Sequence, residues 1–163
     1  MVTEHLACTT TYFNPEEAIG TRKDHLINAD IENLTFLDTE FDLVIHTDVL
    51  EHCNNPTLAI ESCLQILKND GAMIFTIPIR NRIDLSFSTS NKTPKIWHGR
   101  GKWAFSFLPK LDGYLERHVF GKNYAQYLYP TAPERIVTQK YSGTNENELV
   151  ILQMNKTSIV DKL

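Results

Sequence analysis

The segment FDLVIHTDVLEH, residues 41–52, joins an apolar run to a group of polar side chains. The run is short and β-branched and shows no polar alternation, which is typical of a strand covered on both faces of a sheet. Asp48, Glu51 and His52 follow directly. Such groups lie either where water reaches them or where a ligand binds, and the neighbouring segments favour a ligand.

The residues after this segment predict a helix and a second strand. Asn55 can cap a helix whose first position is Pro56, and residues 57–70 place apolar side chains at helical spacing. Gly71 is expected to end this helix in the left-handed conformation. Residues 72–79 form another apolar run, AMIFTIPI. A strand, a helix and a strand with short connections form a right-handed βαβ unit, so the two strands are expected to be parallel.

The rest of the chain adds shorter elements to this unit. HLINADI (25–31) and LACTTTYF (6–13) are expected to be strands, and residues 14–23 a connecting helix or turn. RIVTQKYS (135–142) and LVILQM (149–154) predict an antiparallel hairpin. No internal repeat or second domain is evident, so residues 1–163 are expected to form one domain.

Composition excludes several classes of protein. The chain has 163 residues, of which 42% are hydrophobic and 22% charged, and its formal net charge is −4. That length suits one domain with a core, and the mild acidity argues against a nucleic-acid partner. No apolar run is long enough for a membrane helix, and the N-terminus lacks the pattern of a secretory signal.

The cysteines and the polar strand ends bear on compartment and metal binding. Cys8, Cys53 and Cys63 are odd in number and show no C-x-x-C spacing. They are interpreted as reduced thiols, which predicts a cytoplasmic protein without disulfides or a zinc site. Asp48 and His52 lack a third ligand, so no metal site is expected.

Ligands of open α/β sheets bind beyond the carboxyl ends of the strands. Asp30, Asp48 and Pro78 stand at three such ends. We therefore expect a small-molecule site at this edge of the sheet.

Residues 28–78 resemble the second half of a class I S-adenosylmethionine-dependent methyltransferase, of the type 11 kind. The matching blocks are ADIENLTF (29–36), FDLVIHTDVLEH (41–52) and ILKNDGAMIFTIP (66–78). The resemblance implies an incomplete Rossmann-like, doubly wound α/β fold, whose sheet is mainly parallel with a reversed C-terminal strand. It also implies S-adenosylmethionine as the cofactor and a small molecule as the substrate.

The resemblance assigns roles to individual residues. Asp30 and Ile31 would hold the adenine, Thr47 and Asp48 would lie beside the methionine part of the cofactor, and His52 would be the catalytic residue near the substrate. Other interpretations remain for three of them. Asp30 can be an ordinary turn former, Asp48 can favour the positive end of the next helix, and His52 can be a packing residue.

Residues 80–108 correspond to the position of the family's substrate lid. Trp97, His98 and Arg100 lie there beside two glycines, and aromatic rings next to a His and an Arg can bind an anionic or planar substrate. The alternative is a loop whose tryptophans cover the core.

One motif of the family is missing. Its members begin with a strand and a glycine-rich turn that lets the cofactor approach the backbone, whereas Gly20 is the only glycine before Gly71 here. Losing the first strand would leave residues 41–47 with an unpaired edge. A homodimer, a complementing polypeptide or a rearranged sheet could cover that edge.

Two functions therefore remain open. The chain is either an S-adenosylmethionine-dependent methyltransferase acting on a small molecule or other nucleophile, or a catalytically inactive binding or partner subunit derived from one.

Overall fold

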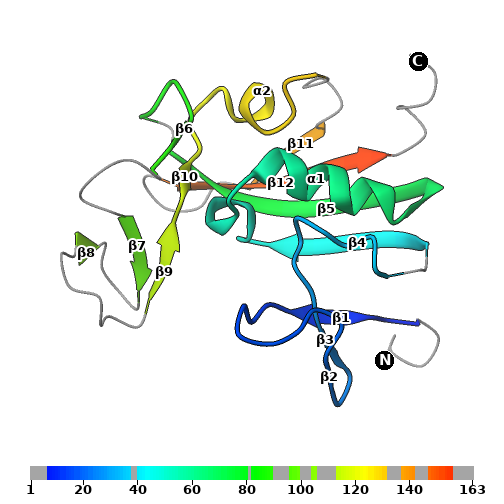
Figure 1. Ribbon diagram of the computed structural model, residues 1–163. Coiled ribbons are helices and arrows are strands. Elements are labelled where there is room, and N and C mark those ends of the chain that lie inside the picture. The colour runs from blue at the N-terminus through cyan, green and yellow to red at the C-terminus, as the bar shows by residue number, and fades with distance from the viewer. Residues whose placement is uncertain are drawn as a thin grey trace.

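The computed structural model describes residues 7–37, 40–80, 82–89, 117–131 and, by their backbone alone, 96–99, 104–105, 113–116, 137–141 and 147–155. Its main body is a four-stranded sheet with two helices on it, and a smaller sheet lies beside the edge of the first (Figure 1). No helix in the described part of the chain is long and apolar enough to cross a membrane.

The main sheet has the strand order β11-β12-β5-β4. Strand β4 (Phe41–Thr47) pairs in parallel with β5 (Leu67–Arg80), as predicted. Strand β12 (Asn147–Asn155) runs antiparallel to both β5 and β11 (Val137–Tyr141). Three strands therefore share one direction and the C-terminal strand is reversed. The expected α/β architecture and the terminal hairpin are confirmed.

Helix α1 (Pro56–Gln65) connects the two parallel strands and covers one face of the sheet. The Asn55 side chain accepts a hydrogen bond from the Leu58 amide at 3.2 Å, which caps the helix as expected. The buried face of the helix meets the fully buried β5 side chains. This core contains Ala59, Ile60, Cys63, Leu64, Met73, Phe75 and Ile77.

The expected end of this helix is wrong. Helix α1 stops at Gln65 and Gly71 lies inside β5, where its φ angle is not positive. A Cβ atom at position 71 would approach the Phe41 carbonyl oxygen to 3.0 Å. Gly71 therefore permits the close approach of β4 to β5 and does not terminate the helix.

The smaller sheet has the order β1-β3-β2. Strands β1 (Thr10–Tyr12) and β3 (Leu26–Asn28) are parallel, and β2 (Arg22–Lys23) is antiparallel to β3. Residues 14–21 form turns and no helix, and residues 22–23 form β2. The buried Asn28 side chain bonds to the backbone of Asn14 and Glu17 and holds this segment close to β3.

The remaining elements lie at the ends of the main sheet. Strands β6 (Phe87–Ser88) and β10 (His118–Val119) pair antiparallel, and helix α2 (Tyr124–Leu128) follows them. A further three-stranded sheet has the order β8-β7-β9, and its strands are β7 (Ile96–Gly99), β8 (Ala104–Phe105) and β9 (Gly113–Glu116).

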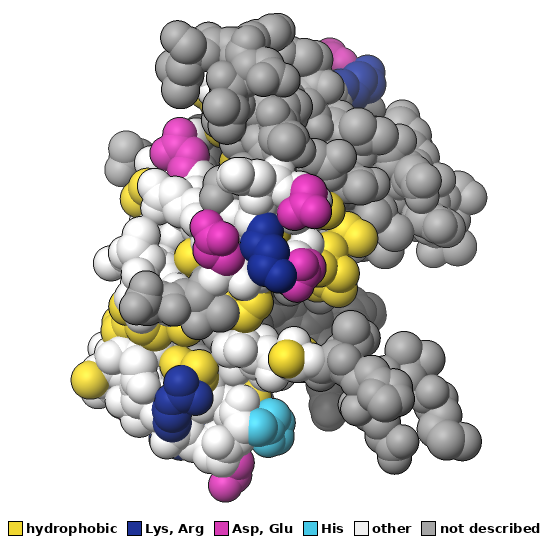
Figure 2. Space-filling view, turned by 90° about the vertical axis from the view of Figure 1, so that its right-hand side faces the viewer, with side chains coloured by type: hydrophobic (Ala, Val, Ile, Leu, Met, Phe, Trp, Pro, Cys, Tyr) yellow, Lys and Arg dark blue, Asp and Glu magenta, His cyan; other side chains and the backbone are white. Residues whose placement is uncertain are grey.

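Strand β4 differs from the prediction in its burial. Leu43 and Ile45, on the face opposite α1, are 45% and 63% exposed. Val44, on the other face, packs against the core. The strand is thus covered on one face only and forms the edge of its sheet. Figure 2 views the molecule from the end where β4 and β5 begin, and hydrophobic side chains reach the surface there among charged ones.

Two matched truncations on α1 test this packing. Ile60 is fully buried, so Ile60→Ala should lower the free energy of unfolding by about 2–5 kcal/mol. Leu58 is 43% exposed on the same helix, and Leu58→Ala should cost less than about 1 kcal/mol. Urea denaturation measures both values, and equal losses would mean that α1 does not face the core as described.

Candidate functional site

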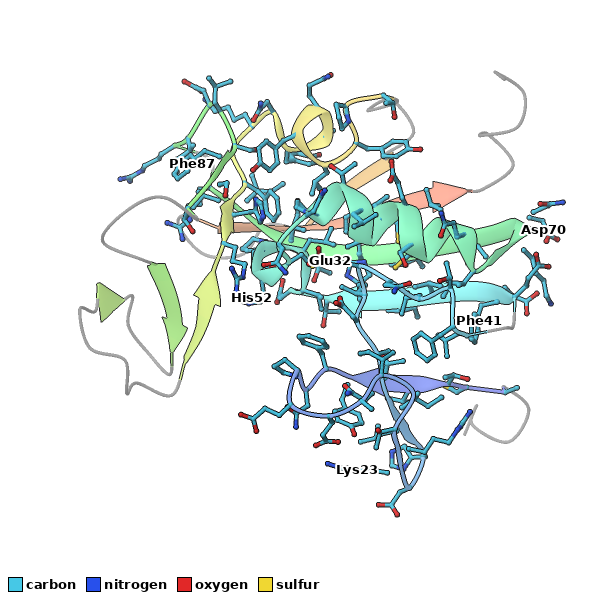
Figure 3. The ribbon with its side chains drawn as sticks, in the orientation of Figure 1. Lys23, Glu32, Phe41, His52, Asp70 and Phe87 are labelled. Carbon is cyan, nitrogen blue, oxygen red and sulfur yellow. The ribbon has the colours of Figure 1, made fainter. Side chains whose placement is uncertain are left out.

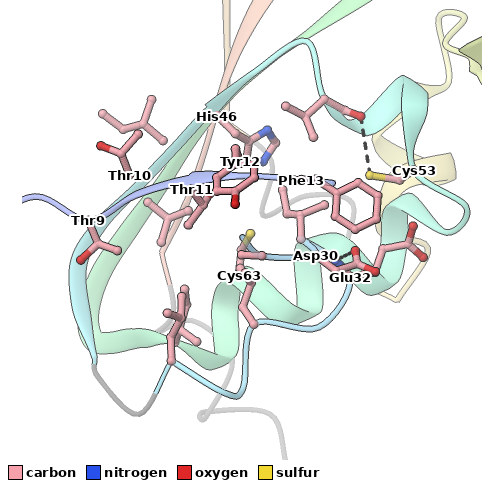
Figure 4. A pocket seen from close by; sticks show the side chains of 18 of the residues that line it. Thr9, Thr10, Thr11, Tyr12, Phe13, Asp30, Glu32, His46, Cys53 and Cys63 are labelled. Atoms are coloured by element: carbon pink, nitrogen blue, oxygen red, sulfur yellow. Dashed lines mark hydrogen bonds between the residues drawn. The ribbon is translucent and has the colours of Figure 1, made fainter. Parts of the chain in front are cut away.

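A pocket of about 660 Å³ lies between β1 and β4. Its walls are the facing edges of the two strands, and α1 contributes Cys63 to its base (Figure 4). Other lining residues come from the connection after β3, from the carboxyl end of β4 and from the short helix η1 (Leu50–His52). The pocket therefore extends along both strands and reaches the edge where the sequence predicts ligand binding.

Asp30 and Ile31, the predicted adenine-binding residues, line this pocket. They follow β3 in a tight turn, in which the Asn33 amide donates to the Asp30 carbonyl oxygen at 2.9 Å. Asp30 Oδ1 accepts a hydrogen bond from the Glu32 amide, also at 2.9 Å. This turn fixes the Asp30 carboxylate at the pocket wall, so both the turn-forming and the ligand-binding interpretation describe the same geometry.

The segment that carries Asp30 is attached to the start of α1. Glu32 Oε1 accepts from the Asn54 amide at 2.6 Å and its Oε2 from the Asn55 amide at 3.1 Å. The Leu34 amide donates to the buried Ser62 hydroxyl at 2.7 Å. A carboxylate beside the amides that begin a helix is electrostatically favourable. These contacts join the smaller sheet to the main body.

Thr47 and Asp48 end β4 in different surroundings. Thr47 lines the pocket, whereas Asp48 is not among the lining residues. Asp48 adopts a left-handed conformation with φ of 49°, and its Oδ1 accepts from the Thr76 hydroxyl at 3.1 Å. Its amide donates to the Thr76 carbonyl oxygen at 3.2 Å. Asp48 therefore forms the turn at the end of β4 and is hydrogen-bonded to Thr76 of β5.

His52 lies at the end of the pocket where β4 finishes, while Phe41 marks the opposite end (Figure 3). The side chain of His52 is 27% exposed, and its Nε2 is 3.8 Å from Oε1 of the buried Glu51. Glu51, which was expected at the ligand-binding edge of the sheet, is 1% exposed. A buried carboxylate beside the ring can orient His52.

Arg117 is a pocket residue that sequence reasoning missed. Its amide donates to the Glu51 carbonyl oxygen at 2.6 Å, which brings the segment between β9 and β10 against η1. No local pattern marks Arg117, because its position depends on how the chain returns from the β7–β8–β9 sheet. The site thus contains a cation near the carboxyl end of β4.

The predicted substrate residues are only partly described. Trp97 and His98 lie in β7, which pairs with β9. Their side chains and all of Arg100 are outside the described residues. Strand β9 contacts η1, so this small sheet stands next to the end of the pocket that carries His52.

His46 is a second residue that sequence reasoning missed. Its ring lines the pocket and stacks on Phe75, with ring centroids 5.1 Å apart. Both ring nitrogens are buried and have no hydrogen-bond partner among the described residues. Burial lowers the pKa of His46 from 6.5 to about 4, so the ring is neutral at pH 7.

The two buried cysteines of the pocket, Cys53 and Cys63, are not activated thiols. Burial raises the pKa of Cys53 and of Cys63 to about 12 in each case. Both are therefore protonated at neutral pH and unsuited to nucleophilic catalysis. The described residues also contain no group of three His, Cys, Asp or Glu side chains that could hold a metal.

The pKa of His46 predicts a pH-dependent stability. Since the folded value is about 4 and the unfolded value 6.5, the unfolded chain binds more protons between these limits. Stability is fully present above about pH 6.5 and should fall by up to about 3 kcal/mol as the pH drops towards 4. His46→Leu should flatten this part of the profile in urea titrations at successive pH values.

Phe75→Leu is the matched control for this experiment. It removes the ring stacked on His46 and lowers stability at every pH, but it should keep the slope between pH 6.5 and 4. An unchanged slope in His46→Leu would show that His46 is not the group responsible.

Comparisons with known proteins show one family match and several similar solved structures. Residues 5–75 match the family model described as a methyltransferase domain. No curated protein matches the chain significantly. Solved structures similar to it include an S-adenosylmethionine-dependent methyltransferase from Clostridium acetobutylicum, with 14% identity and a TM-score of 0.44. In that pair the alignment covers 82% of this chain and 65% of the other.

Two further structures show the same level of similarity. One is a SAM-dependent methyltransferase from Methanosarcina mazei, with 10% identity, a TM-score of 0.47 and coverage of 79% and 65%. The other is the glycopeptide N-methyltransferase MtfA in complex with S-adenosyl-L-methionine, with 7% identity, a TM-score of 0.49 and coverage of 80% and 64%. The chain thus spans less than two thirds of the length of these proteins. Residues 5–75, somewhat less than half of the chain, are thus similar to the methyltransferase domain family.

Proposed function

We propose that this chain supplies the acceptor-side part of an enzyme that transfers a methyl group from S-adenosylmethionine to a small-molecule nucleophile. The supporting observation is that Asp30, Thr47 and His52, from three separate segments, line one pocket at the carboxyl ends of parallel strands. Ligands of α/β sheets bind at this edge.

The described residues fit one part of the cofactor. Asp30 offers a carboxylate to an adenine amino group, and Ile31, Leu34 and Leu37 provide an apolar wall beside it. A ring that is apolar on its faces and polar at its edge suits such a wall. Strand β1 also lines the pocket, and Thr10 or Thr11 there takes the place of the acidic residue that the family has at the end of its second strand. The fit is therefore confined to the adenine end.

The chemistry requires positioning more than acid–base catalysis. When bound, the cofactor supplies a methyl group on a positively charged sulfur, which a nucleophile displaces in line. His52 and Arg117 stand at the end of the pocket where an acceptor would enter, and the His52 ring lies beside Glu51. Their proposed role is to orient the acceptor, which is the larger part of the catalytic effect in such reactions. Trp97, His98 and Arg100 are proposed to bind the acceptor from the lid at residues 80–108.

A second function follows from one specific feature. Because the chain has no glycine-rich turn before Gly71, the cofactor lacks the close backbone approach that this family gives it. An inactive methyltransferase-derived subunit that binds a partner is the alternative proposal. It predicts that no cofactor binds to the isolated chain.

The open edge of β4 supports a proposal about assembly. A strand edge with apolar side chains on both faces readily pairs with another chain. We propose that the working form contains a second polypeptide, either in a homodimer or as a complementing chain. The buried, unpaired Cys53 and Cys63 support the proposal that the protein works in a reducing, cytoplasmic compartment.

Calorimetric titration with S-adenosylmethionine tests the methyltransferase proposal. A Kd below about 100 μM, equivalent to about 5.5 kcal/mol, is expected. Asp30→Ala should weaken binding by about tenfold or more, because it removes the acceptor for the adenine amino group. His52→Gln should leave the affinity nearly unchanged.

Asp84→Ala is the matched control, since Asp84 is exposed and lies outside the pocket. It should bind the cofactor as the unmodified chain does. The absence of binding at millimolar cofactor would reject the enzyme proposal for the isolated chain and favour the inactive subunit.

A further inference from the structure

We propose that Arg117 forms a carboxylate-binding subsite at the end of the pocket that carries His52, and that the molecule held there is a small monocarboxylate. This inference deepens the proposed function and rests on it only for calling that molecule the methyl acceptor. Binding of a carboxylate can be measured without the cofactor, so each of the two can fail without the other.

The backbone of Arg117 is fixed from two sides. Its amide donates to the Glu51 carbonyl oxygen at 2.6 Å, and its carbonyl oxygen accepts from the Thr89 amide, also at 2.6 Å. The Ser88 hydroxyl donates to the same carbonyl oxygen at 3.4 Å. These bonds connect Arg117 to η1 on one side and to the end of β6 on the other. Its side chain therefore extends from a rigid position, as a binding residue requires.

The next residue, His118, strengthens this anchor. Its side chain is buried, with Nδ1 2.8 Å from the Tyr127 hydroxyl oxygen and Nε2 3.2 Å from the Asn54 carbonyl oxygen. Burial lowers the pKa of His118 below its usual value, so the ring is neutral at pH 7. In the neutral ring Nε2 carries the proton, because a carbonyl oxygen only accepts, and Nδ1 accepts from Tyr127. His118 thus holds β10 in place without adding a charge beside Arg117.

The guanidinium group of Arg117 takes part in none of these bonds. It lines the pocket and forms no ion pair or hydrogen bond with any other residue that the structure describes. Within that part of the chain, Arg117 is also the only Lys or Arg that lines the pocket. A guanidinium is permanently charged and offers five N–H donors in a planar fork. A cation on a fixed backbone, with its donors unused, is suited to binding an anion.

The groups around Arg117 favour a ligand with a single negative charge. The carboxylates of Asp30 and Glu32 line the same pocket, and Glu51 lies beside His52. A phosphate with two negative charges would be repelled more strongly by these carboxylates than a ligand with one. A carboxylate carries one charge, and its two oxygens match the two parallel N–H groups of the guanidinium fork. The expected ligand is therefore a carboxylate.

The position of Arg117 in the chain places this ligand on the acceptor side. Arg117 directly follows β9, which pairs with β7 and contacts η1 (Figure 1). Strand β7 carries Trp97 and His98, which are proposed to bind the acceptor. S-adenosylmethionine has a carboxylate of its own, which is the competing occupant of the subsite. The experiment must therefore distinguish a separate carboxylate from that of the cofactor.

NMR titrations with acetate and benzoate, each paired with its neutral amide, provide the test. The NMR signal of the Arg117 Nε–H group reports on binding, and acid and amide have nearly the same shape. We expect the acids to shift this signal and to bind about tenfold or more tightly than the amides, because charged partners form the stronger hydrogen bonds. Inorganic phosphate should bind more weakly than benzoate. Equal affinities for acid and amide, or tighter binding of phosphate, would overturn the proposal.

Three variants identify the cation. Arg117→Gln keeps the backbone bonds that fix this segment and should abolish the preference for acid over amide. Arg117→Lys keeps the charge without the planar fork and should retain part of the preference. Lys122→Gln is the matched control, because Lys122 is an exposed cation outside the pocket, and it should bind benzoate as the unmodified chain does. An undiminished preference in Arg117→Gln, or an equal loss in Lys122→Gln, would contradict the assignment.

Cofactor titrations separate this inference from the proposed function. Arg117→Gln should bind S-adenosylmethionine within about twofold of the unmodified chain, and the cofactor should not displace benzoate. Displacement of benzoate, or a loss of cofactor affinity of about tenfold in Arg117→Gln, would assign Arg117 to the cofactor's own carboxylate and overturn the proposal. Benzoate binding through Arg117 in a chain that binds no cofactor supports the subsite and rejects the methyltransferase role. Cofactor binding that depends on Asp30, in a chain that binds no acid, supports the enzyme and rejects the subsite.

Discussion

Among the described residues, strand β4 pairs only with β5, along one edge, and its other edge faces the pocket. The main sheet therefore ends at Phe41–Thr47, beside the candidate site. Unpaired backbone groups in an apolar setting cost about 1–3 kcal/mol each, against a net stability of about 5–15 kcal/mol for a typical domain. The same edge that carries the candidate site is therefore the least stable part of the sheet.

The smaller sheet is held to the main body by hydrogen bonds that do not involve the open edge of β4. Glu32 bonds to the amides before α1, and Leu34 bonds to Ser62 on the helix. These bonds hold Asp30 on one wall of the pocket while Thr47 and His52 come from the other. The site is thus assembled by side-chain contacts with α1, and no strand pairing joins its two walls in the described residues.

The sequence was sufficient for the elements that depend on local patterns. The apolar runs at 41–47 and 72–79 with the capped helix between them predicted parallel neighbours, and the hairpin at the end followed from two short runs and a polar turn. The sequence also predicted that Asp30, Ile31, Thr47 and His52 lie near one edge of the sheet, because strand ends converge there; all four line the pocket, and their binding roles stay predictions. The sequence did not predict the features that depend on tertiary contacts. Gly71 lies where β4 and β5 approach each other closely, and Glu51 is buried where the segment between β9 and β10 packs against it. Arg117 and His46 line the pocket because of packing that no local sequence pattern indicates.

Amide hydrogen exchange of the chain alone, resolved by residue, tests the central claim most directly. The account predicts that amides of β4 directed away from β5 exchange much faster than those of the central strand β5, at protein concentrations low enough to exclude association. Protection of these β4 amides equal to that of β5 would contradict it, because it would mean that the edge is already paired within a single chain.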